Sequence, residues 1–210
     1  MIPLFVDFSG KKVVIFGGGD VAARKAALFC REAKVFVVSR SFSPVLLAMP
    51  VECVTKRILP GNEAQLADLI GSAQLVIAAL PDPAMNDAIG ALCREHGVLF
   101  NNADGKKGNV FVPSVIQGKR YTIGIGTEGA SPAISRYLRE LVERECPDLD
   151  GMIGLQMRLR AALKEKEPDQ KKRQEILRAV VRDKDVWASL SQGEEKAWEF
   201  VQGRYLVALR

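Results

Sequence analysis

A glycine-rich segment near the N-terminus has the spacing of a phosphate-binding turn. The residues Gly17-Gly18-Gly19-Asp20-Val21-Ala22 read G-x-G-x-x-A, directly after an apolar stretch and at the start of an amphipathic one. In such a turn the first glycine allows the tight bend, the second lets a diphosphate approach the backbone, and the small third residue lets helix and strand pack closely. The anion binds free N–H groups at the helix N-terminus. This context predicts a dinucleotide site; an ordinary glycine-rich turn is the alternative.

The choice between NAD and NADP depends on residues about twenty positions further along. An acidic residue there binds the ribose 2′-hydroxyl of NAD. This chain has Ser39-Arg40-Ser41 instead. Arg40 can accept a 2′-phosphate, so NADP stays open beside NAD, and an exposed loop arginine is an equal alternative.

A second segment of small residues, Ala78-Ala79-Leu80-Pro81-Asp82, ends another apolar run. Open parallel sheets bind ligands beyond the carboxyl ends of their strands, where small residues let a cofactor lie against the backbone. Tight packing explains Ala78 and Ala79 equally well. We expect the cofactor to contact Gly17, Gly19, Asp20, Val21, Ala22, Ser39, Arg40, Ser41, Ala79, Leu80 and Pro81.

The sequence gives little indication of a metal site or of disulfide bonds. His96 is the only histidine, and it ends a predicted helix before Gly97, where a structural role is favoured. The cysteines are widely spaced and form no C-x-x-C pair, which indicates reduced thiols and a cytoplasmic protein. They are Cys30, Cys53, Cys93 and Cys146. We therefore expect no bound metal.

Strands and helices alternate through the first hundred residues. Short β-branched runs predict strands over 11–16, 35–39, 51–55, 75–80 and 98–101. Apolar residues at helical spacing predict helices over 20–31, 63–70 and 84–96. This alternation predicts an α/β fold, a Rossmann-like parallel sheet covered on both faces.

The pattern changes after Asp104, which by itself reads as the first residue of an Asp-Gly turn with Gly105. Strands over 110–117 and 121–127 flank a Gly118-Lys119 turn and predict a hairpin. Ser131-Pro132 starts a helix to about residue 145, with the serine as N-cap. From Met152 onward the chain reads as helical, with breaks at Pro168 and Gly193. The expected domains are 1–113, an NAD-binding Rossmann domain, then 114–150, and then 151–210, which is helical.

Composition indicates a globular protein. Hydrophobic residues make up 48% and charged residues 26% of the 210 residues. No apolar run is long enough to cross a membrane, and the N-terminus lacks the features of a signal peptide.

The net charge of +5 equals the excess of positive charge within residues 158–184, which carry ten cations and five anions. Such a segment is a solvated helix face or attracts nucleic acid, a membrane or a polyanionic small molecule. An NAD(H)-binding redox regulator is thus a remote alternative, without a recognisable helix-turn-helix.

Several segments together resemble the precorrin-2 dehydrogenase family, which occurs alone or as the N-terminal part of multifunctional siroheme synthases. They follow the family's order over residues 1–145. The segments are Pro3-Leu4-Phe5, the stretch from Val14 to Lys25, Ala78-Ala79-Leu80-Pro81-Asp82, Asn101-Asn102-Ala103-Asp104, Phe111-Val112-Pro113-Ser114 and Gly129-Ala130-Ser131-Pro132. The series is far more specific than G-x-G-x-x-A alone. Beyond residue 150 the chain matches only as a helical region.

The resemblance implies a Rossmann domain, a dimerisation segment over 114–150 and a helical C-terminal domain. It also implies a homodimer that uses NAD to oxidise precorrin-2 to sirohydrochlorin in siroheme biosynthesis. Some members also insert Fe²⁺ into sirohydrochlorin, so the alternative is a bifunctional enzyme that is also a ferrochelatase. Whether the protein works with a separate chelatase or methyltransferase is left open by the sequence. With one histidine, such chelation must use a carboxylate or the macrocycle itself.

The resemblance further implies which residues do the chemistry. It makes Asp104 the catalytic residue, at the carboxyl end of the 98–101 strand. It places Asn102, Ser114, Thr127 and Ser131 at the substrate, although Ser131 serves equally well as an N-cap only. The basic 158–184 segment would then face the substrate's many carboxylates.

Overall fold

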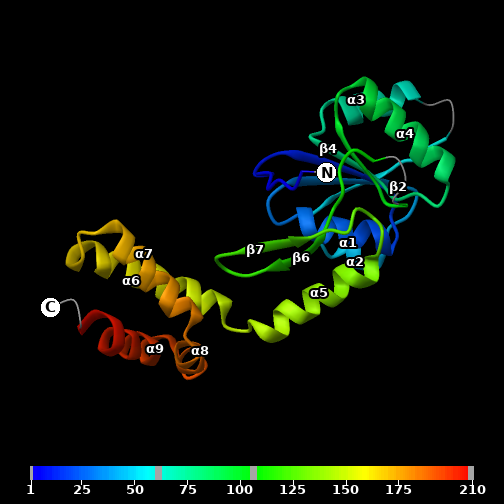
Figure 1. The fold of residues 1–210 in the computed structure, drawn as a ribbon. Helices are drawn as coiled ribbons and strands as arrows, with labels where there is room; N and C mark the ends of the chain where they lie inside the picture. The colour runs from blue at the N-terminus through cyan, green and yellow to red at the C-terminus, as the bar shows by residue number, and fades with distance from the viewer. Residues whose placement is uncertain (1, 60–62, 105–107, 208–210) are drawn as a thin grey trace. The chain divides into compact units, whose positions relative to one another are not determined.

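The computed structural model describes residues 2–59, 63–104 and 108–207. The chain divides into two compact units, Met1–Val112 and Pro113–Arg210. Strands alternate with helices through the first unit, whereas the second consists of a hairpin followed by helices (Figure 1). The division of the chain into three domains stays a prediction.

The first unit is built on five parallel strands in the order β3-β2-β1-β4-β5. They are β1 (Lys12–Phe16), β2 (Lys34–Ser39), β3 (Glu52–Thr55), β4 (Leu75–Ala78) and β5 (Leu99–Asn102). The strand order reverses between β1 and β4, and ligands of such sheets bind beyond the carboxyl ends of the strands at that point. The predicted Rossmann-like sheet is confirmed.

Helices cover both faces of this sheet (Figure 1). One face carries α1 (Asp20–Phe29) and the short α2 (Pro44–Leu47), which was not predicted; the other carries α3 (Glu63–Gly71) and α4 (Pro83–Glu95). Successive residues of a strand point to opposite faces, so Val13 and Ile15 pack under α1 while Val14 and Phe16 pack under α3 and α4. All four are fully buried because neither face is open to water.

The predicted strand 75–80 is too long, since β4 ends at Ala78. The Ala79 N–H still donates to the carbonyl of Phe16, the last residue of β1, at 2.8 Å. The backbone N–H and C=O of Leu80 then bond to a side chain of α4 instead of a neighbouring strand. The chain therefore leaves the sheet where its partner strand ends.

The second unit begins with the predicted hairpin. Strands β6 (Ser114–Gln117) and β7 (Thr122–Ile125) pair antiparallel, and α5 (Pro132–Glu145) follows. The Gly118 N–H donates to the carbonyl of Tyr121 at 3.0 Å, which leaves Lys119 and Arg120 as the turn residues, one position later than the predicted Gly118-Lys119.

The remainder of the second unit is helical, as predicted. It contains α6 (Leu149–Lys166), α7 (Gln170–Arg182), α8 (Lys184–Leu190), α9 (Glu194–Val201) and a π-helical turn, Gln202–Leu206. Leucines four residues apart in α6, at 155, 159 and 163, pack with apolar residues of the later helices in one core. Among the described residues, no helix combines the length and the apolar character needed to span a membrane.

Candidate active site

The glycine turn between β1 and α1 fits closely against its neighbours. Gly17 has φ of 121°, a conformation that favours glycine, and a side chain there would meet the carbonyl of Ala79. At Gly18 an added Cβ would meet the carbonyl oxygen of Ser41 and lie 2.8 Å from the Ser39 Oγ. The turn therefore lies directly against the ends of β2 and β4.

Gly19 is the opposite case, and its surroundings suit a diphosphate. It is exposed, it caps α1 without a side chain, and an added Cβ would meet no atom within 4 Å. The backbone N–H groups of the first turn of α1 are therefore approachable, and anions bind at such helix ends. The residues present fit the diphosphate of NAD(P).

The other residues expected at the cofactor lie around this turn. Asp20 and Val21 are exposed in the first turn of α1, and Ala22 is buried against the sheet. Ser39 ends β2, with the exposed Arg40 and Ser41 directly after it. Since the Gly18 carbonyl accepts a 2.8 Å bond from the Ser43 N–H, the segment after β2 is bonded to the glycine turn.

The turn between β4 and α4 contacts Asp104 through Asn86. The Asn86 side chain is fully buried; its Oδ1 accepts from the Leu80 N–H at 3.1 Å, and its Nδ2 donates to the Leu80 carbonyl at 3.0 Å. The same Nδ2 donates to the Asp104 Oδ2 at 3.0 Å. Asn86 thus joins the Ala79–Pro81 turn to the carboxylate.

Asp104 is exposed just beyond β5, so its carboxylate is open to a ligand. Its N–H donates to the Asn102 Oδ1 at 3.1 Å, and Asn102 itself is 5% exposed. Asn102 therefore shapes the turn that carries Asp104. Gly105, the second residue of the predicted Asp-Gly turn, lies outside the described residues.

Three residues expected at the substrate lie in the second unit. Ser114 is the first residue of β6. The Thr127 Oγ1 donates to the Ser131 carbonyl at 3.0 Å, and the Ser131 Oγ accepts from the Ile134 N–H as the N-cap of α5. The Thr127 and Ser131 hydroxyls thus shape the turn before α5, in which Glu128 has a positive φ of 54°.

The structure therefore gathers Asp104, Asn102 and the expected cofactor residues at one edge of the first unit's sheet. Sequence reasoning missed Asn86 among them. A signal was present, because Asn86 belongs to the buried face of α4 with Ile89, Gly90 and Cys93, at helical spacing. A polar residue on such a face needs hydrogen-bonding partners inside the protein.

Three further groups of chemistry-bearing side chains are His96, Lys25 and the cysteines. His96 is exposed and caps the end of α4. Burial, and then the neighbouring Arg24, lower the pKa of Lys25 in α1. All four cysteines are free, and the described residues contain no cluster of three or more His, Cys, Asp or Glu side chains suited to a metal.

Comparison with known proteins gives concordant matches. Residues 4–114 match the family described as "Putative NAD(P)-binding". A precorrin-2 dehydrogenase of Methanosarcina barkeri is 41% identical over 203 residues, which cover 94% of this chain and 90% of that protein. A siroheme synthase of Azotobacter vinelandii is 30% identical over 97% of this chain, which spans only 44% of that longer protein. The solved structure of SirC, a precorrin-2 dehydrogenase, shares the fold with a TM-score of 0.73 at 19% identity, covering 97% of this chain and all of that one.

Proposed function

The chain belongs to the precorrin-2 dehydrogenase family, and from this membership we propose that it oxidises precorrin-2 to sirohydrochlorin in siroheme biosynthesis. The observation that carries the proposal is the hydrogen-bonded link from the Leu80 turn through Asn86 to Asp104. This link joins the expected cofactor turn to an acid–base group at one edge of the sheet. A dehydrogenase needs both groups beside its substrate.

The oxidation removes a hydride and a proton from the substrate. When bound, NAD(P) supplies the acceptor for the hydride. The Gly17–Ala22 turn and the start of α1 would hold the diphosphate, and the Ala79–Pro81 turn would offer backbone surface for the rest of the cofactor. We propose NAD as the preferred cofactor from the family resemblance, with NADP as the competitor because Arg40 is exposed at the end of β2.

Asp104 is the residue that we assign to the proton. Its carboxylate is exposed, so substrate can reach it, and a positioned carboxylate can take a proton from a reacting carbon and release it to water. Its backbone is fixed by Asn102 and its side chain by Asn86. Asp104→Ala should therefore lose nearly all activity, and a fully active variant would remove this assignment.

The substrate carries many carboxylates. From the family resemblance we assign Ser114, Thr127 and Ser131 to substrate binding, together with cations of the 158–184 segment. Lys171, Lys172 and Arg178 on α7 are all exposed, so they are free to meet anionic groups. We also assign Asn102 to substrate binding, beside its part in shaping the Asp104 turn.

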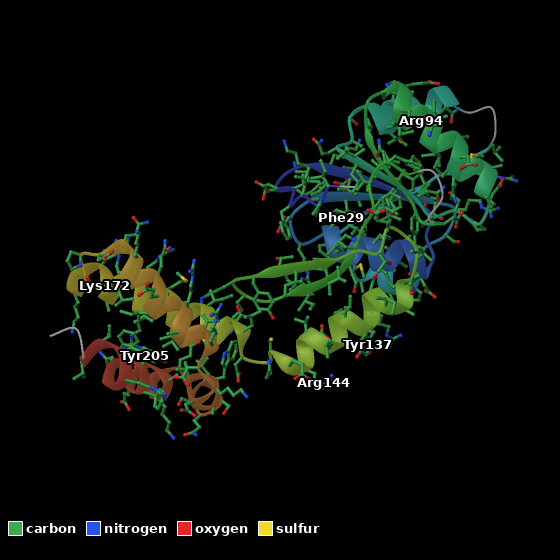
Figure 2. All side chains as sticks on the ribbon, viewed as in Figure 1. Phe29, Arg94, Tyr137, Arg144, Lys172 and Tyr205 are labelled. Atoms are coloured by element: carbon green, nitrogen blue, oxygen red, sulfur yellow. The ribbon has the colours of Figure 1, made fainter. Side chains whose placement is uncertain are left out.

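A homodimer in the cytoplasm completes the proposal. The apolar side chains of Ile134, Tyr137 and Leu138 on α5 are 49%, 56% and 37% exposed, at the spacing of one helix face. Figure 2 labels Tyr137 on this helix. Exposed apolar faces of this kind favour association. The four free thiols are in keeping with a reducing compartment.

The direct test is an anaerobic spectral assay with precorrin-2 and each nicotinamide cofactor in turn. We expect sirohydrochlorin to form faster with NAD than with NADP, and no conversion with either cofactor would refute the proposal. Adding Fe²⁺ to sirohydrochlorin in the same cuvette tests the bifunctional alternative. Iron insertion no faster than without protein would remove that second activity.

A further inference from the structure

Asn86 makes an unusual set of bonds for a buried amide. It is 0% exposed, yet one of its three described hydrogen bonds runs to the exposed carboxylate of Asp104. The other two hold the N–H and the carbonyl of a single residue, Leu80. Both segments thus contact one rigid side chain that extends from the first turns of α4.

We infer that Asn86 is a positioning residue, which fixes the Asp104 carboxylate relative to the Leu80 turn; this rests on the proposed function. The bonds to Leu80 alone would keep the shape of the β4–α4 turn. The third bond, from the second N–H of the Nδ2 group to Asp104, is not needed for that shape. Water could solvate the exposed Asp104 carboxylate instead. A buried donor of this kind restricts the orientation of the carboxylate that it contacts.

The pH profile of Asn86→Asp separates positioning from support of the turn. The variant keeps the shape of the side chain and an oxygen for the Leu80 N–H, but it loses the Nδ2 donor to both the Leu80 carbonyl and the Asp104 Oδ2 and places a second carboxylate beside Asp104. Two carboxylates in contact disfavour each other's ionisation. We expect kcat at neutral pH to fall about ten-fold or more, and the acid limb of the pH profile to move upward by about one pH unit or more.

Asn101→Asp is the matched control. Asn101 is also an almost fully buried asparagine near the site, 5% exposed on β5, and its Nδ2 donates to the Val110 carbonyl at 2.8 Å. Its described hydrogen bond runs to this carbonyl, not to Asp104. We expect this variant to lose stability without any movement of the acid limb. A profile that moves equally in both variants, or in neither, would overturn the inference.

A second measurement uses the wild-type protein and does not depend on the folding of a variant. The side-chain amide signal of Asn86 in a ¹⁵N–¹H spectrum should shift with pH, at the same midpoint as the acid limb of kcat/KM. The shift should disappear in Asp104→Asn. An Asn86 signal that does not respond to pH, or responds identically in Asp104→Asn, would contradict the contact.

The two proposals fail in different ways. If Asp104→Ala is fully active, the assignment of the proton to Asp104 is wrong. If Asp104→Ala is inactive while Asn86→Asp retains the wild-type pH profile, the catalytic assignment stands and the role of Asn86 is overturned.

Discussion

At the scale of single residues, the three consecutive glycines have different tasks. Gly17 adopts a positive φ beside Ala79, and Gly18 leaves room for the Ser39–Ser41 segment. Gly19 has open space around it and an ordinary φ of −90°. Gly17 and Gly18 are therefore required for the close packing of the turn against its neighbours, whereas Gly19 leaves room for a ligand.

Two alanine variants should distinguish these tasks. Gly18→Ala places a methyl group against the Ser41 carbonyl, so we expect it to cost about 1–3 kcal/mol of stability. Gly19→Ala should retain the wild-type melting temperature and yet bind NAD at least about ten-fold more weakly, because the methyl group occupies the space where a diphosphate would approach. Thermal unfolding and fluorescence titration with NADH measure the two effects. Equal losses of stability in both variants would contradict this distinction.

Cys93 provides a prediction about pH. Burial raises the pKa of its thiol to about 12, and its side chain is 0% exposed on α4. Because the thiolate is the reactive form, the folded protein should leave Cys93 unlabelled by iodoacetamide at pH 8 to 9, while the exposed Cys53 reacts. Mass spectrometry of the labelled peptides checks this, and Cys93 should react once the protein is denatured. Labelling of Cys93 at the rate of Cys53 in the folded protein would refute the buried placement.

At the scale of elements, the β6–β7 hairpin is bonded to the first turn of α6. The Asp150 carboxylate accepts from the N–H groups of Lys119 and Arg120 at 2.9 and 2.8 Å, and the Arg120 guanidinium donates to the Asp150 carbonyl. Both donors are the two turn residues, so this bonding accounts for a turn at Lys119-Arg120 rather than at the predicted Gly118-Lys119. A local sequence pattern does not contain this contact, because Asp150 lies about thirty residues away along the chain.

Asp150→Ala should therefore loosen the hairpin. It removes two charge-assisted bonds, so we expect a loss of about 2 kcal/mol in the free energy of unfolding. Urea unfolding followed by circular dichroism measures this loss. Asp148→Ala is the control, because Asp148 precedes the same helix without a side-chain capping bond, and it should change stability much less. Similar losses in both variants would show that the hairpin contact contributes little.

At the scale of the whole molecule, the proposed assembly concerns α5. Buried apolar residues are absent from the described part of this helix, whose buried side chain is Ser135, while an apolar stripe remains exposed. The family resemblance places the dimerisation segment in the same stretch, residues 114–150. The exposed stripe is thus the natural candidate for the surface between two copies.

Tyr137→Glu should weaken the dimer, because it places a charge within the exposed stripe of α5 (Figure 2). Light scattering coupled to size exclusion should give a dimer for the wild type and monomer for the variant at micromolar concentration. Arg144→Glu, at an exposed site later on the same helix, is the charge control and should stay dimeric. A wild-type protein that is monomeric at all concentrations would refute the proposed assembly.

The sequence by itself determined the class of the fold and the family. Residues 17–22 follow a β-branched run and begin a helix, and the alternation of strands and helices requires a parallel sheet. These signals are local, because strand and helix patterns depend on neighbouring residues. The ordered segments from Pro3 to Pro132 then gave the activity by resemblance, and the relatives bear this out. The roles of individual site residues stay predictions.

Only the tertiary structure decided how these segments meet. It ended β4 at Ala78 rather than residue 80, and it brought Asn86 against both Leu80 and Asp104. The physical reason is that β4 and β5 pair in parallel, Ala78 beside Asn102, so the segments after the two strands leave the same edge of the sheet. That register depends on the packing of two helix layers against all five strands, which no local pattern in the chain specifies.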